Sequence, residues 1–199
     1  MRCQADLYSN HGLAPKQPKW YSALLARAIV CFAVCVVIQL GFYLSLIASA
    51  ASLSADDEIE VAAAISELEA KGFDNEVFML KHLAIFRATD NWLNASVAKE
   101  NAYAATNFPF EIITLYPDFF TYPMDDTERA AILLHEARHL FGDDEAEAYR
   151  FVWSHRRQLG WTQEKYFNSP VWTNVRKQTR EAVPELFICD ADPRGDCDE

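Results

Sequence analysis

The chain has 199 residues, of which 51% are hydrophobic, and it carries a formal net charge of −11 at pH 7. This length allows one compact domain with an appendage, and no internal repeat or second domain boundary is visible. Residues 52–199 hold 28 acidic and 14 basic residues, so they have no electrostatic reason to bind nucleic acid or an anionic membrane surface. The simplest role of this acidity is solubility.

The N-terminal part contains one long apolar segment. Residues 28–51 carry no charge and would extend about 36 Å as a helix, enough to cross a hydrocarbon layer of about 30 Å. We therefore predict one transmembrane helix at 28–51, between a segment at 1–27 and a domain at 52–199. Four basic residues and one acidic residue precede the span, and the acidic run 56–58 follows it. The positive-inside rule places 1–27 in the cytoplasm and the domain on the extracytoplasmic side, periplasmic or extracellular.

A cleaved signal peptide is the competing interpretation of the apolar segment. Ala48, Ser49 and Ala50 resemble a small-residue cleavage site. However, the leader and the apolar run are both longer than in a signal peptide, which favours an uncleaved anchor. Both interpretations deliver the same domain to the same compartment.

Cysteine usage agrees with this topology. Cys31 and Cys35 lie inside the apolar span, where a cysteine serves as a small apolar residue, and Cys3 precedes the span. Only Cys189 and Cys197 belong to the domain. We expect them to close one short disulfide loop in an oxidising compartment.

The first half of the domain predicts two helices and one strand. Apolar residues at helical spacing run through 56–71, which Gly72 ends, and through about 75–90. Residues 110–116, between two prolines, form the clearest strand. Two roles are open for this strand: a binding edge that pairs with extended peptide, or a plain core strand in a small sheet.

The sequence HEARH at 135–139 has the spacing of a zinc site on one turn of helix. His135 and His139 fall about 40° apart around a helix, so both imidazoles can reach one metal ion. Glu136 lies about 100° round the helix from His135. It is poorly placed to bind the metal and well placed to take a proton from a water on it.

The flanking residues favour this interpretation over a surface helix that carries two histidines by chance. Asp125 and Glu128 have the spacing of a capping box, which marks a helix start, and Gly142 is a natural stop. An apolar face lies on the side away from the histidines, so we expect the histidines to face a cleft.

A catalytic zinc takes three protein ligands and leaves one position open, so a third ligand is needed. Glu145 is our choice: if the next helix begins near Asp144, Glu145 and Tyr149 lie four residues apart on one face. Glu147 is the reserve ligand. It lies about 200° from Glu145, so only one of the two can serve, and the other is a solvated acid at the helix start. The simplest interpretation of Asp143 and Asp144 is that they are N-cap and first-turn residues of the next helix. The alternative is that one of them orients a histidine.

The remainder of the domain is predicted to be helical. One helix is expected at 145–159, ended by Gly160, and another at 171–182, opened by Ser169 and Pro170. The expected fold is therefore mainly α (α+β): a helical domain with a small β-sheet, preceded by one transmembrane helix.

From Glu111 to Tyr149 the chain resembles the zincin superfamily of HExxH metallopeptidases. Residues 135–145 read HExxHxxGxxE, which is similar to the metzincin arrangement with glutamate in the third-ligand slot, although no methionine follows Met124 to form a methionine turn. The acidic start of the next helix is similar to gluzincins, with a shorter gap. The upstream strand, and an acid followed closely by tyrosine, are similar to aspzincins. That likeness implies a zincin-like domain in which Tyr149 donates a hydrogen bond to the oxyanion of a tetrahedral intermediate.

These observations favour a membrane-anchored zinc metallopeptidase that acts on a peptide or protein near the membrane. Zinc on His135, His139 and Glu145 would polarise the scissile carbonyl, and Glu136 would pass a proton from the zinc-bound water to the leaving amine. The alternatives are a non-proteolytic zinc-binding or degenerate peptidase-like module, or a zinc hydrolase of a non-peptide amide. Glu136 is present, which argues against degeneration, and only His155 lies near enough in sequence to complete a structural site. The oligomeric state is not indicated.

Overall fold

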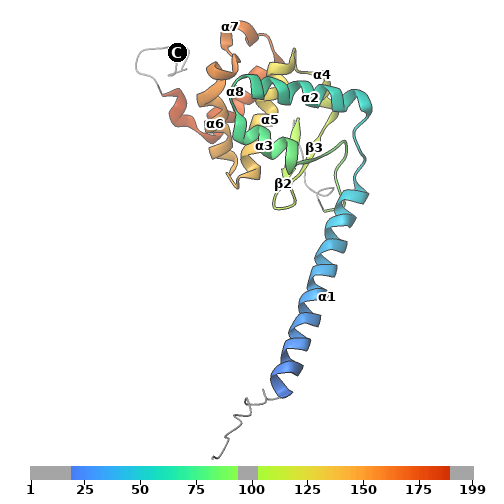
Figure 1. The fold of residues 1–199 in the computed structure, drawn as a ribbon. Helices are drawn as coiled ribbons and strands as arrows, with labels where there is room; N and C mark the ends of the chain where they lie inside the picture. Colours follow the sequence, from blue (N-terminus) through green and yellow to red (C-terminus); the bar gives the residue numbers. More distant parts are fainter. Residues whose placement is uncertain (1–18, 94–102, 189–199) are drawn as a thin grey trace, which may run out of the picture. The chain divides into compact units, whose positions relative to one another are not determined.

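A computed structural model of the chain describes residues 19–93 and 103–188. The protein is mainly helical, with a small three-stranded sheet and one long apolar helix near the N-terminus (Figure 1), which confirms the predicted fold class. It divides into two compact units, residues 1–43 and 44–199. The predicted disulfide between Cys189 and Cys197 lies outside the described residues.

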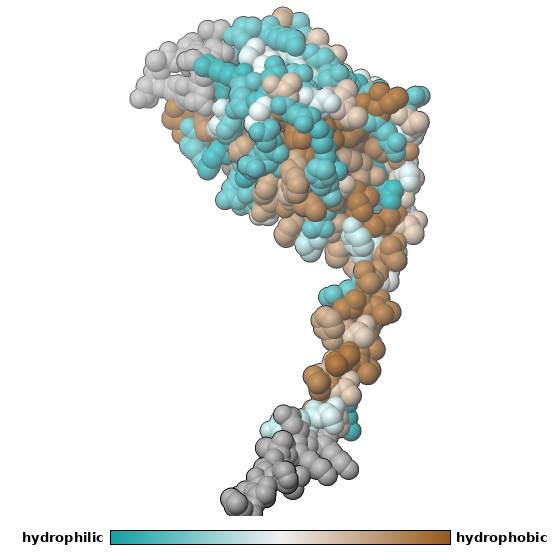
Figure 2. All heavy atoms as spheres, viewed as in Figure 1, coloured by the Kyte–Doolittle hydropathy of each residue, from teal (hydrophilic) through white to brown (hydrophobic). Residues whose placement is uncertain are grey.

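Helix α1 (Lys19–Ser49) is long and apolar enough to cross a membrane. The most apolar 18-residue window of its stretch from Trp20 to Ser49 has a mean hydropathy of 2.5, and none of that window is buried in protein. Figure 2 shows this hydrophobic surface along the helix. The helix begins nine residues before the predicted span, because hydropathy marks only the apolar part of a helix, while its polar flank can continue the same backbone hydrogen bonding.

The last turns of α1 belong to the second unit. Leu46 is fully buried there. Ser49 Oγ accepts a hydrogen bond from the backbone N–H of Trp92 at 3.2 Å, and the indole N–H of Trp92 donates to Ser45 Oγ at 3.2 Å. Residues 44–51, which the sequence assigned to the membrane span, therefore include part of the packing of the folded domain.

Helix α5 is the central element of the domain. The described helices of the domain are α2 (Ala55–Ala70), α3 (Asp74–His82), α4 (Pro117–Thr121), α5 (Asp126–Leu140), α6 (Glu145–Leu159), α7 (Gln163–Tyr166) and α8 (Pro170–Ala182), followed by the 3₁₀ turn η1 (Pro184–Phe187). Helices α2, α3 and α6 all pack against α5. Most of the α5 side chains are buried, so burial on several sides fixes the helix that carries the HEARH sequence.

The sheet contains β1 (Ile85–Arg87), β2 (Ala104–Asn107) and β3 (Ile112–Leu115) in the order β1-β3-β2. Strand β3 is parallel to β1 and antiparallel to β2, and all four of its residues are buried. Of the two roles open for the strand at 110–116, the structure therefore shows the core strand. The open edge that borders α5 is β2, which the sequence did not predict as a strand.

The prediction of one helix through 75–90 is wrong in its second half. Helix α3 ends at His82, and Ile85 and Phe86 instead pair with Ile112 and Ile113 of β3. These residues have high strand propensity, and pairing with a distant strand decides between two local possibilities that periodicity cannot separate.

The start of α5 confirms one half of the predicted capping box and corrects the other. Asp125 is the N-cap, and its Oδ1 accepts hydrogen bonds from the N–H groups of Thr127 and Glu128 at 3.1 and 3.2 Å. The carboxylate of Glu128 is fully buried and does not return to Asp125. It accepts from the N–H of Met124 at 2.8 Å and from the indole of Trp161 at 3.3 Å, because burial selects the partners that satisfy both oxygens.

Asp125 also joins α5 to α7. Lys165 Nζ and the Tyr166 hydroxyl donate to its carboxylate at 3.0 and 2.8 Å. Burial raises the pKa of Asp125, but the hydrogen bonds from Lys165, Tyr166 and the Glu128 N–H together outweigh burial and hold that pKa below its ordinary value. A carboxyl group with a lowered folded pKa stabilises the protein above its unfolded pKa of about 3.9, and this stabilisation is lost as pH falls through the folded pKa.

We therefore expect Asp125→Ala to lower the free energy of unfolding by about 1 kcal/mol at neutral pH, the usual contribution of an N-cap. The difference from wild type should shrink as pH falls below about 4, because Asp125 is protonated first in the unfolded chain and then, at its lower pKa, in the folded protein. Denaturant unfolding of the full chain in detergent micelles at neutral and acidic pH measures both values. Asp126→Ala, in the same first turn but outside this cluster, is the control. A loss for Asp125→Ala that does not change with pH would contradict the electrostatic explanation.

Candidate metal centre

The histidines lie on a face of α5 that the core does not fully cover. Leu133, Leu134 and Ala137 are fully buried, whereas His135 and His139 are only partly buried. Because four residues make little more than one helical turn, the two imidazoles project in nearly the same direction. This arrangement agrees with the predicted position of the histidines on a cleft.

A tight turn after α5 brings the next helix back over the histidines. Gly142 has φ of 91°, in the left-handed region that costs other residues free energy. Its N–H donates to the carbonyl of His139 at 3.0 Å, and the N–H of Asp143 donates to the carbonyl of Arg138 at 3.2 Å. These bonds end α5 at Leu140 and allow α6 to begin only five residues later.

At the start of α6, the two candidate third ligands, Glu145 and Glu147, lie in different environments. Asp144 is its N-cap, and Asp144 and Glu147 form a capping box with hydrogen bonds of 2.9 and 3.2 Å between side chain and backbone. The carboxylate of Glu147 is therefore engaged at the helix start. Glu145 instead faces the histidines, and it is the carboxylate that the structure groups with them.

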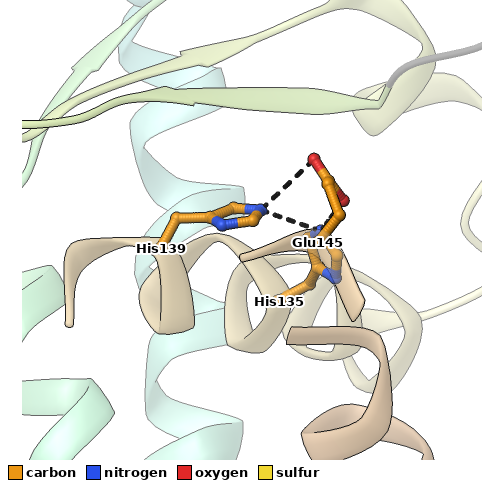
Figure 3. A group of neighbouring side chains, drawn as sticks. All are labelled: His135, His139 and Glu145. Carbon is orange, nitrogen blue, oxygen red and sulfur yellow. Dashed lines mark hydrogen bonds and ion pairs between the residues drawn. The ribbon is translucent and has the colours of Figure 1, made fainter. Parts of the chain in front are cut away.

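Four potential ligand atoms from three residues converge at this point (Figure 3). His135 Nε2 lies 3.1 Å from His139 Nε2 and 3.2 Å from Glu145 Oε2, and His139 Nε2 lies 3.5 Å from Glu145 Oε1. Nitrogen and oxygen ligands bind zinc at about 2.0–2.2 Å, so two ligands of a tetrahedral zinc are about 3.3 Å apart. The three separations are close to those between two ligands of a tetrahedral zinc ion.

A backbone carbonyl group fixes the orientation of the His139 ring. His139 Nδ1 lies 2.9 Å from the carbonyl oxygen of Asp143. A carbonyl only accepts hydrogen bonds, so Nδ1 carries the proton and Nε2 keeps its lone pair. The predicted orienting role of Asp143 is therefore performed by its main chain, not its carboxylate. The Nδ1 atom of His135 is buried and has no hydrogen-bond partner within the described part of the chain.

Glu136 is held by a residue that the sequence analysis missed. Its side chain is buried, and the hydroxyl of Thr106, on β2, donates to Glu136 Oε2 at 2.7 Å. This contact leaves Oε1 as the oxygen that can exchange a proton in the cleft. No local pattern marks Thr106, because the contact joins residues 30 apart and depends on where β2 packs.

Two further side chains on α6 have shifted pKa values. The hydrogen bond from His135 lowers the pKa of Glu145, so this group is a carboxylate at neutral pH. Burial, and then the negative charge of Glu145, raise the pKa of the Tyr149 phenol. Tyr149 therefore keeps its proton and can donate a hydrogen bond, and its ring lies 4.4 Å from that of His135.

These residues line a cleft of about 480 Å³ between β2 and helices α5, α6 and α8. Tyr116 N–H donates to the carbonyl of Tyr103 at 3.0 Å, which makes this a hydrogen-bonded pair of the antiparallel ladder. Because such pairs alternate, Ala104 and Thr106 direct their backbone groups away from β3, toward the open edge. Among the described residues no strand pairs with this edge of β2, so the cleft is bordered by the strand edge on one side and by Glu145 and Tyr149 on another.

No known family model, curated protein or solved structure matches the chain. The interpretation of the site therefore depends on its own geometry. His155 is the residue that the sequence left as a possible fourth ligand of a structural site. His155 Nδ1 bonds to the carbonyl of Phe151 at 2.8 Å and its ring stacks on the Phe151 ring, so it is not grouped with the cluster.

Proposed function

We propose that this protein is a membrane-anchored, zinc-dependent peptidase of the zincin type. The observation that carries the proposal is the spacing of 3.1–3.5 Å among the potential ligand atoms of His135, His139 and Glu145. Glu136 lines the same cleft, so a general base accompanies the metal ligands. Two histidines and a glutamate would leave one zinc position open, as a catalytic site requires.

A zinc ion held by these three residues would supply a Lewis acid that polarises a carbonyl group and acidifies water. Glu136 would supply the proton transfer: its Oε1 would take a proton from the attacking water as the water oxygen bonds to the carbonyl carbon, and would pass that proton to the amine nitrogen as the C–N bond breaks. Thr106 keeps the carboxylate oriented through Oε2. Tyr149 donates its phenolic proton in a hydrogen bond to the carbonyl oxygen as negative charge develops there.

The edge of β2 favours a peptide over a small amide as the substrate. Ala104 and Thr106 offer backbone N–H and C=O groups to an extended chain, which is how proteins bind peptides by strand addition. The cleft volume of about 480 Å³ is within the range of about 300–1,000 Å³ for ligand pockets. An extended peptide would lie along β2 and bring one carbonyl group over the histidines.

The charge pattern around α1 supports an extracytoplasmic domain. Basic residues precede the apolar part of the helix and acidic residues follow it, and positively charged flanks remain in the cytoplasm. The substrate of an anchored domain of this kind would be a peptide or protein close to the membrane surface.

Removal of metal tests the proposal directly. The full chain in detergent micelles should cleave members of a mixed peptide library, and mass spectrometry of the products identifies the bonds. Treatment with a chelator should abolish cleavage, and one equivalent of zinc should restore it. Cleavage that survives complete removal of metal would contradict the proposal, as would a zinc-loaded chain that cleaves no peptide.

A further inference from the structure

Arg138, a residue inside the HEARH sequence, makes contacts that zinc binding alone does not require. Its Nε and Nη2 atoms lie 2.8 and 2.7 Å from Asp143 Oδ2, and its Nη1 lies 2.9 Å from Glu76 Oε1. One guanidinium group thus joins α5 both to the turn that precedes α6 and to α3.

The surroundings of this group hold it in one position. The Glu76 side chain is only 7% exposed, and a buried carboxylate is stable only when it is paired. The guanidinium also stacks over the ring of Phe151 at 4.2 Å and that of Phe141 at 4.9 Å. A planar group with several fixed donors suits this site, where two carboxylates approach from different elements between aromatic rings.

Asp143 connects this ion-pair network to the metal ligands. Its carboxylate is bound by Arg138, while its main-chain carbonyl accepts the Nδ1 proton of His139 at 2.9 Å. Movement of the Asp143 side chain would therefore move the atom that orients the histidine. Partners that orient a ligand in this way usually affect metal affinity about 10- to 100-fold.

We infer that Arg138 is a positioning residue of the metal centre: by binding Asp143 and Glu76, it fixes the carbonyl group that orients His139. The inference rests on the proposed zinc function and adds a residue that touches neither metal nor substrate. It also assigns α3 a part in the site, because Glu76 anchors the guanidinium from outside the helix pair that carries the ligands.

The variants separate positioning from folding. Asp143→Ala removes the carboxylate that Arg138 holds and leaves the buried pair with Glu76 intact. Arg138→Lys keeps a positive charge for Glu76 but cannot donate to both carboxylates in the same geometry. The control is Arg129→Lys on the same helix, because Arg129 also pairs with two acidic residues, Asp126 and Glu60, away from the cleft.

The measurement is titration of the full chain in detergent micelles with Co²⁺, whose visible absorption reports its ligand geometry, and with Zn²⁺ against a chromophoric chelator. We expect Asp143→Ala and Arg138→Lys to weaken zinc binding about tenfold and to alter the cobalt spectrum, and Arg129→Lys to match wild type. A purely structural role would lower only the melting temperature. Wild-type affinity and spectrum in both site variants would overturn this inference alone, whereas a wild-type chain that binds neither metal would overturn the proposed function as well.

Discussion

Glu136→Gln is expected to abolish peptide cleavage while the chain still binds zinc with wild-type affinity. Glutamine has the shape of glutamate and can still accept the hydrogen bond from Thr106, but it cannot take up a proton at neutral pH. Loss of a general base usually slows a reaction about 10²- to 10⁴-fold. Rates of cleavage of one identified peptide, together with zinc affinity, measure both parts of the prediction.

Glu147→Gln is the matched control for this experiment. Glu147 is an acidic residue near the site, but its carboxylate belongs to the capping box of α6, where glutamine serves as well as glutamate. Its cleavage rate should stay within about twofold of wild type. A Glu136→Gln chain that cleaves peptides at the wild-type rate would exclude Glu136 as the general base.

Glu145→Ala is expected to weaken zinc binding by more than about 100-fold, which exceeds the usual effect of residues that only orient a ligand. The reason is that it removes one of three ligands and leaves two histidines to hold the ion. Competition with a chromophoric chelator measures the affinity. The Glu145 side chain is 70% exposed, so its removal should leave the melting temperature of the metal-free protein close to that of wild type.

Glu147→Ala provides the contrast, because the two acids stand two positions apart at the start of α6. It removes half of the capping box and should lower stability by about 1 kcal/mol or less while zinc affinity stays unchanged. Equal zinc affinities of the two alanine variants would refute the assignment of the third ligand to Glu145.

The elements that carry the metal ligands could be predicted because their signals are local. Asp125, Gly142 and Asp144 each specify a helix end through contacts within a few residues. Once α5 and α6 are defined, the helical repeat places the two histidines together. The sequence favoured Glu145 over Glu147 because Glu145 lies four residues from Tyr149, and the structure adds that the carboxylate of Glu147 is engaged in the capping box of α6.

The remainder of the site depends on contacts between distant parts of the chain. Thr106 reaches Glu136 across 30 residues and Glu76 reaches Arg138 across 62. Strand β2, whose sequence is Ala-Ala-Thr-Asn, has a single β-branched residue, Thr106, and no aromatic residue, so its strand propensity is low; it forms because β3 offers it a paired edge. Such contacts are decided by packing, so sequence periodicity alone could not reveal them.

The most direct test of the metal centre is the zinc content of the purified full chain, measured by elemental analysis against protein concentration. One zinc per chain is expected for wild type and for Glu136→Gln, and much less for Glu145→Ala after dialysis. A wild-type chain that retains no stoichiometric zinc, even after zinc is supplied during purification, would contradict the account of this site.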